Sequence, residues 1–287
     1  GSSDEFGRAV GISGDYAFVG ARREDTGGTD RGSVYIYVRS GTTWSQHAQI
    51  QASDAQDSDN FGWALSVDGD YAIVGAYIED TGGLDAGSAY IFYKSGTTWS
   101  QQAKIQSSDI QADDRFGVSV DIDGDYVIVG AEYEDTGGSN AGSAYVFVRS
   151  GTSWTQQAIL RASDAQADDR FGGYDPTVSI SGSFAVIGAH NEDAGGSNAG
   201  AAYIFERSGT TWTEVKKIVA SNPTASDFFG QTVAIDGTTV LVGAREEDTK
   251  ASAAGAAYIF SKAPKAVPAL NFDGYNKLSI DNVTDSK

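Results

Sequence analysis

Residues 61–76 read FGWALSVDGDYAIVGA, and this segment carries the first indication of the architecture. An apolar run, 63–67, and a β-branched run, 71–74, stand on either side of Asp68-Gly69-Asp70. Glycine adopts positive φ readily and aspartate caps turns, so this tripeptide is typical of a tight turn. The segment therefore predicts two antiparallel strands joined as a hairpin and ended by a Val-Gly-Ala triplet.

Two more strands are expected downstream of this hairpin. Residues 88–93 are aromatic and β-branched and are closed by a Ser-Gly pair. Residues 99–105 alternate between two faces with period two, starting at Trp99. A polar, acidic linker follows at 107–115, and no window shows a helical stripe beyond a single short turn at 163–170. The unit is therefore a set of four short strands.

This unit recurs five times. Phe-Gly pairs are spaced by 55, 55, 55 and 58 residues, at Phe6-Gly7, Phe61-Gly62, Phe116-Gly117, Phe171-Gly172 and Phe229-Gly230. A Val-Gly-Ala or Ile-Gly-Ala triplet and an aromatic pair follow in every copy, and Trp44, Trp99, Trp154 and Trp212 mark the fourth strand of the first four copies. A fixed period of this length indicates a repeat architecture.

The repeat predicts an all-β fold, a β-propeller of five four-stranded blades of about 55 residues each. A β-solenoid would have shorter coils, and a sandwich would not show five similar copies. We expect the propeller to span residues 1–263 and residues 264–287 to form a C-terminal tail. The fifth copy lacks its Trp strand, so either residues 267–275 fill that place or the missing strand precedes residue 1 in a parent protein.

The copies resemble FG-GAP repeats, the blade units of integrin α-subunit heads and of bacterial surface proteins. The resemblance rests on the Phe-Gly pair, the Val-Gly-Ala triplet and the Tyr-x-Phe strand, and it covers residues 4–262. It implies a calcium loop between the first two strands, but the turns here, such as Asp68-Gly69-Asp70, are too short to surround a cation that needs 6–8 oxygens. The chain is thus similar to bacterial variants without that loop. Residues 269–274 resemble the opening strand of a laminin-G-like domain.

Composition excludes several classes of function. The chain has 287 residues, a formal net charge of −19, no cysteine and two histidines. It therefore has no disulfide scaffold or thiolate metal site, and its charge argues against nucleic acid as a partner. No apolar run is long enough for a transmembrane segment. The chain starts Gly1-Ser2-Ser3, which indicates a processed form or a fragment.

Candidate binding residues lie where otherwise similar copies differ. A divergent pair follows each Val-Gly-Ala triplet, and these pairs are predicted to lie in exposed loops on one face: Arg22-Arg23, Tyr77-Ile78, Glu132-Tyr133, His190-Asn191 and Arg245-Glu246. Neutral drift at exposed positions is the simpler interpretation. The functional one is a mixed aromatic and charged patch that binds sugars or a protein surface.

A second candidate set lies just beyond these pairs. Glu-Asp recurs in all five copies, and in four of them an Asp or Asn stands five residues after the Asp: Asp25 and Asp30, Asp80 and Asp85, Asp135 and Asn140, Asp193 and Asn198. Such oxygens suit calcium, but capping of a tight loop explains the same residues and is favoured.

No nucleophile elbow, phosphate loop or metal-ligand spacing is present, so an enzyme is not expected. The sequence favours a non-catalytic binding or adhesion module at the cell surface or outside the cell, recognising a surface protein or a glycan. A lectin and a structural spacer that contacts neighbouring domains or subunits at the ring junction are the alternatives.

Overall fold

The structure is a computed structural model that describes residues 3–174, 176–248, 254–261 and 278–279. It is all-β, and each of its five sheets contains four strands in sequence order. The first sheet contains β1 (Phe6–Ser13), β2 (Tyr16–Ala21), β3 (Ser33–Ser40) and β4 (Thr43–Ile50). The second contains β5 (Leu65–Asp68), β6 (Tyr71–Ala76), β7 (Ser88–Ser95) and β8 (Thr98–Ile105).

The remaining sheets repeat this order. The third contains β9 (Ser119–Asp123), β10 (Tyr126–Ala131), β11 (Ser143–Ser150) and β12 (Ser153–Leu160). The fourth contains β13 (Val178–Ser181), β14 (Phe184–Ala189), β15 (Ala201–Ser208) and β16 (Thr211–Ile218), and the fifth contains β17 (Phe229–Asp236), β18 (Thr239–Ala244), β19 (Ala256–Ser261) and β20 (Leu278–Ser279). All pairings are antiparallel, which confirms the predicted meander in every copy.

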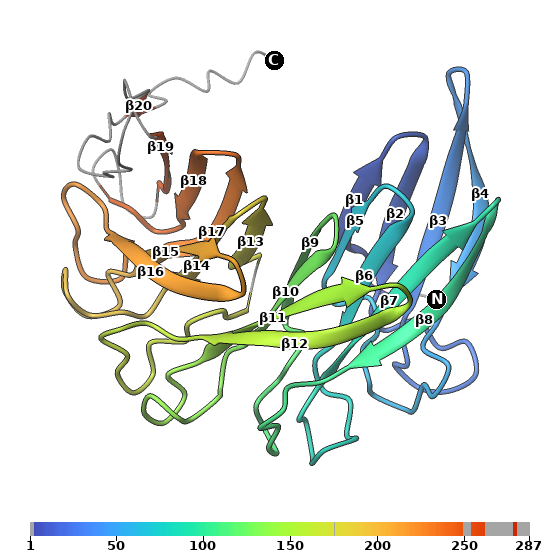
Figure 1. Ribbon diagram of the computed structural model, residues 1–287, viewed down its shortest axis with the longest axis horizontal. Coiled ribbons are helices and arrows are strands. Elements are labelled where there is room, and N and C mark those ends of the chain that lie inside the picture. The colour runs from blue at the N-terminus through green and yellow to red at the C-terminus, as the bar shows by residue number, and fades with distance from the viewer. Residues whose placement is uncertain (1–2, 175, 249–253, 262–277, 280–287) are drawn as a thin grey trace.

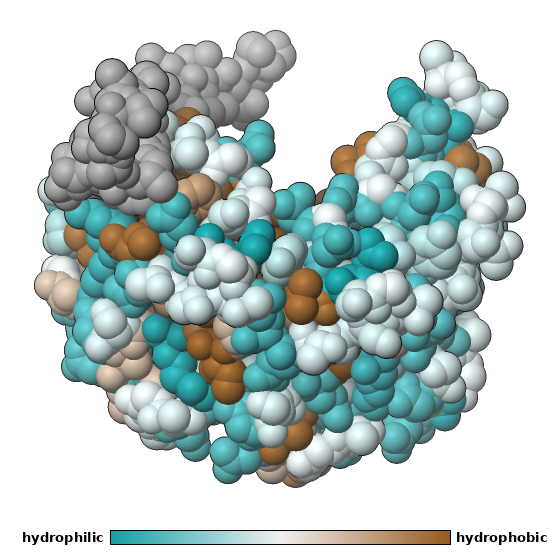
Figure 2. All heavy atoms as spheres, in the orientation of Figure 1, coloured by the Kyte–Doolittle hydropathy of each residue, from teal (hydrophilic) through white to brown (hydrophobic). Residues whose placement is uncertain are grey.

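The sheets are the blades of a five-bladed β-propeller. The first strand of each blade is innermost, since β1, β5, β9, β13 and β17 contact one another in succession. The blades follow an arc that stays open between the first and the fifth (Figure 1). The space-filling view shows the same opening as a notch in the rim (Figure 2). The propeller prediction is confirmed, and the open arc is a feature that the repeat spacing alone does not reveal.

The hydrophobic core is divided among the four blade junctions. Each junction has its own cluster of buried side chains contributed by the two blades that meet there. The Phe of the Phe-Gly pair is completely buried in copies two to five and meets the aromatic pair of its own blade edge to face, as Phe116 meets Tyr145 at 5.5 Å. Repetition therefore produces four equivalent interfaces.

Two glycines are required, the one of the Phe-Gly pair by its backbone conformation in every copy and the one of the Val-Gly-Ala triplet by the neighbouring blade in the first four copies. Gly62 and its equivalents adopt φ between 76° and 96°, a region in which other residues are strained. The carbonyl oxygen of Gly117 lies so close to Gly75 of the preceding blade that any Cβ on Gly75 would overlap it, and the first, third and fourth blades repeat this contact. The glycine of the Val-Gly-Ala triplet is thus crowded by the backbone of the next blade.

Trp99, Trp154 and Trp212 pack on the preceding blade. Trp99 meets Phe18 at 4.9 Å, Trp154 meets Tyr71 at 6.1 Å, and Trp212 donates a hydrogen bond to Gln157. Trp44 has no preceding blade and is exposed.

The fourth strand of the fifth sheet is β20, which pairs with β19 through Ser279 and Leu278. Residues 267–275, one of the two alternatives for that place, lie outside the described residues, as does the laminin-G-like segment. The described part of the chain contains no helix that could cross a membrane.

Candidate functional site

Three positions in each copy come together at one end of the inner strands. They are the residue before Phe-Gly, the residue after it, and the first residue after Val-Gly-Ala. The residue before Phe-Gly has positive φ in all five copies, between 51° and 58°. The residues at the three positions are Glu5, Arg8 and Arg22; Asn60, Trp63 and Tyr77; Arg115, Val118 and Glu132; Arg170, Gly173 and His190; and Phe228, Gln231 and Arg245.

Contacts run continuously from blade to blade across this end. In the first blade, Arg22 donates hydrogen bonds to Glu5 at 2.5 and 2.7 Å and another to Asn60 of the second blade at 3.2 Å. The guanidinium of Arg22 also lies 4.5 Å from the centroid of the Trp63 ring. These bonds lower the pKa of the Glu5 carboxyl, so Glu5 remains ionised and holds Arg22 in place.

Aromatic rings continue the series. The Trp63 ring is 4.4 Å from Tyr77 and 4.8 Å from Tyr174, and its indole N–H donates to the carbonyl of Val118 at 3.0 Å. Burial raises the pKa of Tyr77 to about 12, with a further contribution from Tyr174. Tyr77 is therefore neutral at physiological pH, and it lies buried beneath Trp63 and Tyr174.

Arginines of the third and fourth blades extend this row of contacts. The guanidinium of Arg115 lies 4.3 Å from the centroid of the Tyr133 ring, and that of Arg170 lies 4.9 Å from it. Arg115 also forms an ion pair of 3.2 Å with the buried Glu132. In the fifth blade, Arg245 lies 5.1 Å from the Phe228 ring, which is 6.3 Å from His190. We name Arg8, Arg22, Trp63, Tyr77, Arg115, Tyr133, Arg170 and Tyr174 the arginine–aromatic cluster.

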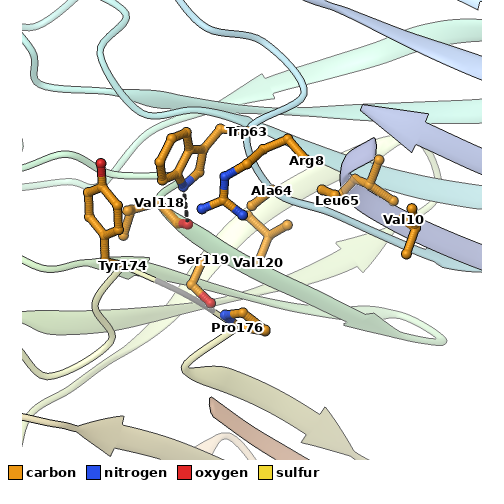
Figure 3. A pocket seen from close by; sticks show the side chains of 11 residues that line it. Arg8, Val10, Trp63, Ala64, Leu65, Val118, Ser119, Val120, Tyr174 and Pro176 are labelled. Atoms are coloured by element: carbon orange, nitrogen blue, oxygen red, sulfur yellow. Dashed lines mark hydrogen bonds between the residues drawn. The ribbon is translucent and has the colours of Figure 1, made fainter. Parts of the chain in front are cut away.

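A cavity of about 240 Å³ opens beside this cluster, between the inner strands (Figure 3). Arg8, Trp63 and Tyr174 are among the residues that line it, and the guanidinium of Arg8 lies 3.9 Å from the Trp63 ring centroid. The walls are largely apolar, with Leu65 and Val118 among them. The cavity thus combines aromatic surface with a positive charge, which suits a carboxylate on an otherwise apolar or ring-shaped group.

The predicted binding residues divide into two groups. Among the first members of the pairs, Tyr77, Glu132 and His190 are buried instead of exposed in loops, which corrects that expectation, whereas Arg22 is half-buried and Arg245 is exposed. The three buried residues are covered because the next blade packs over the end of each second strand.

The second members lie further out. Arg23 pairs with Glu5 at 3.2 Å, and Glu246 pairs with Arg245 at 2.9 Å. Ile78 packs beside Trp63 and Tyr77, Tyr133 belongs to the cluster, and Asn191 is half-buried.

Sequence reasoning missed Arg8, Trp63, Arg115 and Arg170. The signal for them was present, because the residues on either side of Phe-Gly differ among copies as much as the pairs do.

The Glu-Asp loops have a structural role in every copy where they are fully described. The carboxylate of Asp80 accepts the backbone N–H of Asp85 at 2.9 Å, and Asp25, Asp135 and Asp193 do the same for Asp30, Asn140 and Asn198. The preceding glutamate, buried Glu79 for example, accepts from Thr81 and from Ser88. These carboxylates are therefore engaged with their own loop, and no metal-binding group of three or more His, Cys, Asp or Glu occurs among the described residues.

The geometry defines a repeat propeller with a charged, aromatic surface at one end of its axis. The model of the FG-GAP repeat matches five segments, residues 1–37, 44–92, 99–147, 154–205 and 212–260, so the chain belongs to the FG-GAP repeat family. No curated protein matches the sequence. Among solved structures, it is similar to TolB from Acinetobacter baumannii, with 14% identity and a TM-score of 0.47 over 88% of this chain. The chain spans 50% of the length of that protein.

Proposed function

We propose that this chain is a non-catalytic binding module of a secreted or cell-surface protein, and that it recognises a surface protein or a glycan through the arginine–aromatic cluster. FG-GAP propellers are commonly binding modules, which supports the general assignment. The supporting observation is the gathering of Arg8, Arg22, Arg115 and Arg170 over aromatic rings at one end of a chain whose net charge is −19.

The preferred ligand carries carboxylates. Guanidinium groups bind carboxylates through paired, charge-assisted hydrogen bonds, and here the adjacent rings lower the access of water. Tyr174 is the most exposed ring of the cavity wall, whereas Tyr77 is buried between Trp63 and Tyr174. Sugar stacking is therefore assigned to Tyr174. The lectin alternative from the sequence placed a sugar on Tyr77 or Tyr133, and the burial of Tyr77 disfavours the first of these two residues.

Binding of polygalacturonate, measured by isothermal titration calorimetry, tests this proposal, with neutral dextran of similar length as the comparison. We expect affinity for polygalacturonate that falls as salt is raised, and none for dextran. Arg8→Gln removes one charged contact and should weaken binding by about tenfold, which corresponds to ~1.4 kcal/mol.

Arg39→Gln is the matched control, because Arg39 lies at the opposite end of its blade beside Asp15 and should leave affinity unchanged. Absence of binding to polygalacturonate would exclude the acidic glycan as ligand. Equal affinity of the Arg8→Gln variant and the unaltered protein would exclude the cluster as the site.

A further inference from the structure

On the first blade, the face that borders the opening of the arc exposes side chains that are buried in every other blade. Phe6 is 56% exposed, whereas the Phe of the other four Phe-Gly pairs is 0% exposed. Four residues on, Val10 is 69% exposed, whereas its equivalents in the other copies are between 2% and 9% exposed: Leu65, Val120, Val178 and Val233. In those copies this surface packs on the preceding blade. We name Phe6, Gly7, Val10 and Ile12 the plug.

On the fifth blade, the face that borders the same opening also exposes a residue that is buried in the other blades. Leu241 is 43% exposed, whereas Phe18, Ile73, Ile128 and Val186 at the same repeat position are 0–1% exposed. A cavity of about 370 Å³ lies beside it, with Thr232, Gly243, Gly255 and Ala257 among its walls. We name Leu241 and these four residues the seat.

The other four junctions show what such a seat holds. In each, the equivalents of Gly243 and Gly255 are in contact with the backbone of the next copy's Phe-Gly pair, as Gly75 is with Gly117 and Gly87 with Phe116. At Gly243 and Gly255 the close atoms belong to the fifth blade itself, to Thr232 and Arg245. Among the described residues, Phe6-Gly7 is the one Phe-Gly pair whose glycine does not pack on another blade. Nothing lies within 4 Å of a Cβ placed on Gly7.

We propose that the plug of one molecule enters the seat of a second copy of this chain, so that the protein associates head to tail. The two surfaces differ and each is complementary to the other, as required for a heterologous contact that can add further molecules. The arc of blades stays open between the first and the fifth (Figure 1), and Phe6 and Leu241 both remain exposed within one chain. Burial of Phe6, Val10 and Leu241 drives the association. The net charge of −19 on each molecule opposes it.

Sedimentation velocity over a wide range of protein concentration tests this proposal. We expect the average mass to rise above that of a monomer with increasing concentration, and to rise further when salt screens the repulsion between acidic chains. This salt dependence is opposite to that expected for ligand binding at the arginine–aromatic cluster. A monomer at every concentration and salt level would overturn the proposal.

Two variants with complementary defects make the test specific. Phe6→Asp puts a charge on the plug and leaves the seat intact, and Gly243→Ala blocks the seat and leaves the plug intact. Each variant alone should remain monomeric, and an equimolar mixture should form a dimer that grows no further. Leu241→Asp is a second seat variant, and Leu84→Asp, at a loop residue that is 66% exposed, is the matched control that should associate like the unaltered protein.

Two results would contradict head-to-tail association. One is a Gly243→Ala variant that associates normally, which would indicate a symmetric contact through the plug alone. The other is a mixture of the two variants that stays monomeric although circular dichroism shows both to be folded.

Discussion

Asp121 on β9 shows how a single side chain connects three blades. Its carboxylate accepts hydrogen bonds from Ser66 on β5 at 2.7 Å and from Ser179 and the backbone N–H of Ile180 on β13, both at 2.9 Å. Inner strands have one edge without a strand partner in their own sheet, so these side-chain bonds satisfy backbone groups that face the axis.

We expect Asp121→Ala to lower the free energy of unfolding by about 1–3 kcal/mol, because the buried N–H of Ile180 loses its acceptor. Urea denaturation measures this change. Asp70→Ala is the control, since Asp70 forms an exposed ion pair with Lys94 and its loss should cost under about 1 kcal/mol. Equal effects of the two substitutions would show that the contacts between inner strands do not contribute to stability.

At the scale of strands, the glycine that ends the second strand of each blade gives a comparison within one molecule. On β10, Gly130 is in contact with the carbonyl of Gly172 in the next blade, whereas on β18 Gly243 is near the hydroxyl of Thr232 in its own blade. Neither has positive φ, so alanine differs from glycine here only by its Cβ.

We expect Gly130→Ala to destabilise the protein by about 1–3 kcal/mol, because its Cβ overlaps a backbone carbonyl that cannot move without separating two blades. Gly243→Ala should change stability by less than about 0.5 kcal/mol, since the Thr232 hydroxyl can rotate away. Differential scanning calorimetry of both variants measures this contrast. A similar fall in Tm for both would contradict the role assigned to the blade junction.

The sequence predicted the strands well and the surface less well, for a physical reason. Strand positions follow from local alternation and turn residues, and five copies repeat the same evidence. Burial of Tyr77 depends instead on the next blade covering the strand end and on Tyr174 from an insertion in the fourth copy, both distant in sequence. The open arc likewise depends on the angle between neighbouring blades, and no pattern of residues in the sequence predicts that angle.

At the scale of the whole molecule, three equivalent linker aspartates make stability depend on pH. Burial raises the pKa of Asp59, Asp114 and Asp169 to about 6, and nearby carboxylates raise it further while one backbone N–H opposes the shift. Between about pH 4 and pH 6 the folded protein therefore holds more protons than the unfolded chain. The free energy of unfolding falls as pH rises through this window.

We expect a higher Tm at pH 5 than at pH 7. Below about pH 4.5 the trend should reverse. Burial disfavours the ionised forms of Glu24 and Glu79, but hydrogen bonds from Thr and Ser side chains outweigh burial and lower the pKa of both carboxyls. Calorimetry across this range measures the profile. Replacing all three aspartates with asparagine keeps an acceptor for the backbone N–H and should flatten the profile between pH 5 and pH 7. A Tm that rises from pH 5 to pH 7 would refute this account.

The equivalence of the four junctions has a genetic consequence. Because every junction uses the same Phe-Gly pair against the same glycine, deletion or duplication of one 55-residue unit in the gene would join two surfaces that already fit. Recombination between such similar copies could therefore change the number of blades in one step without redesign of any interface.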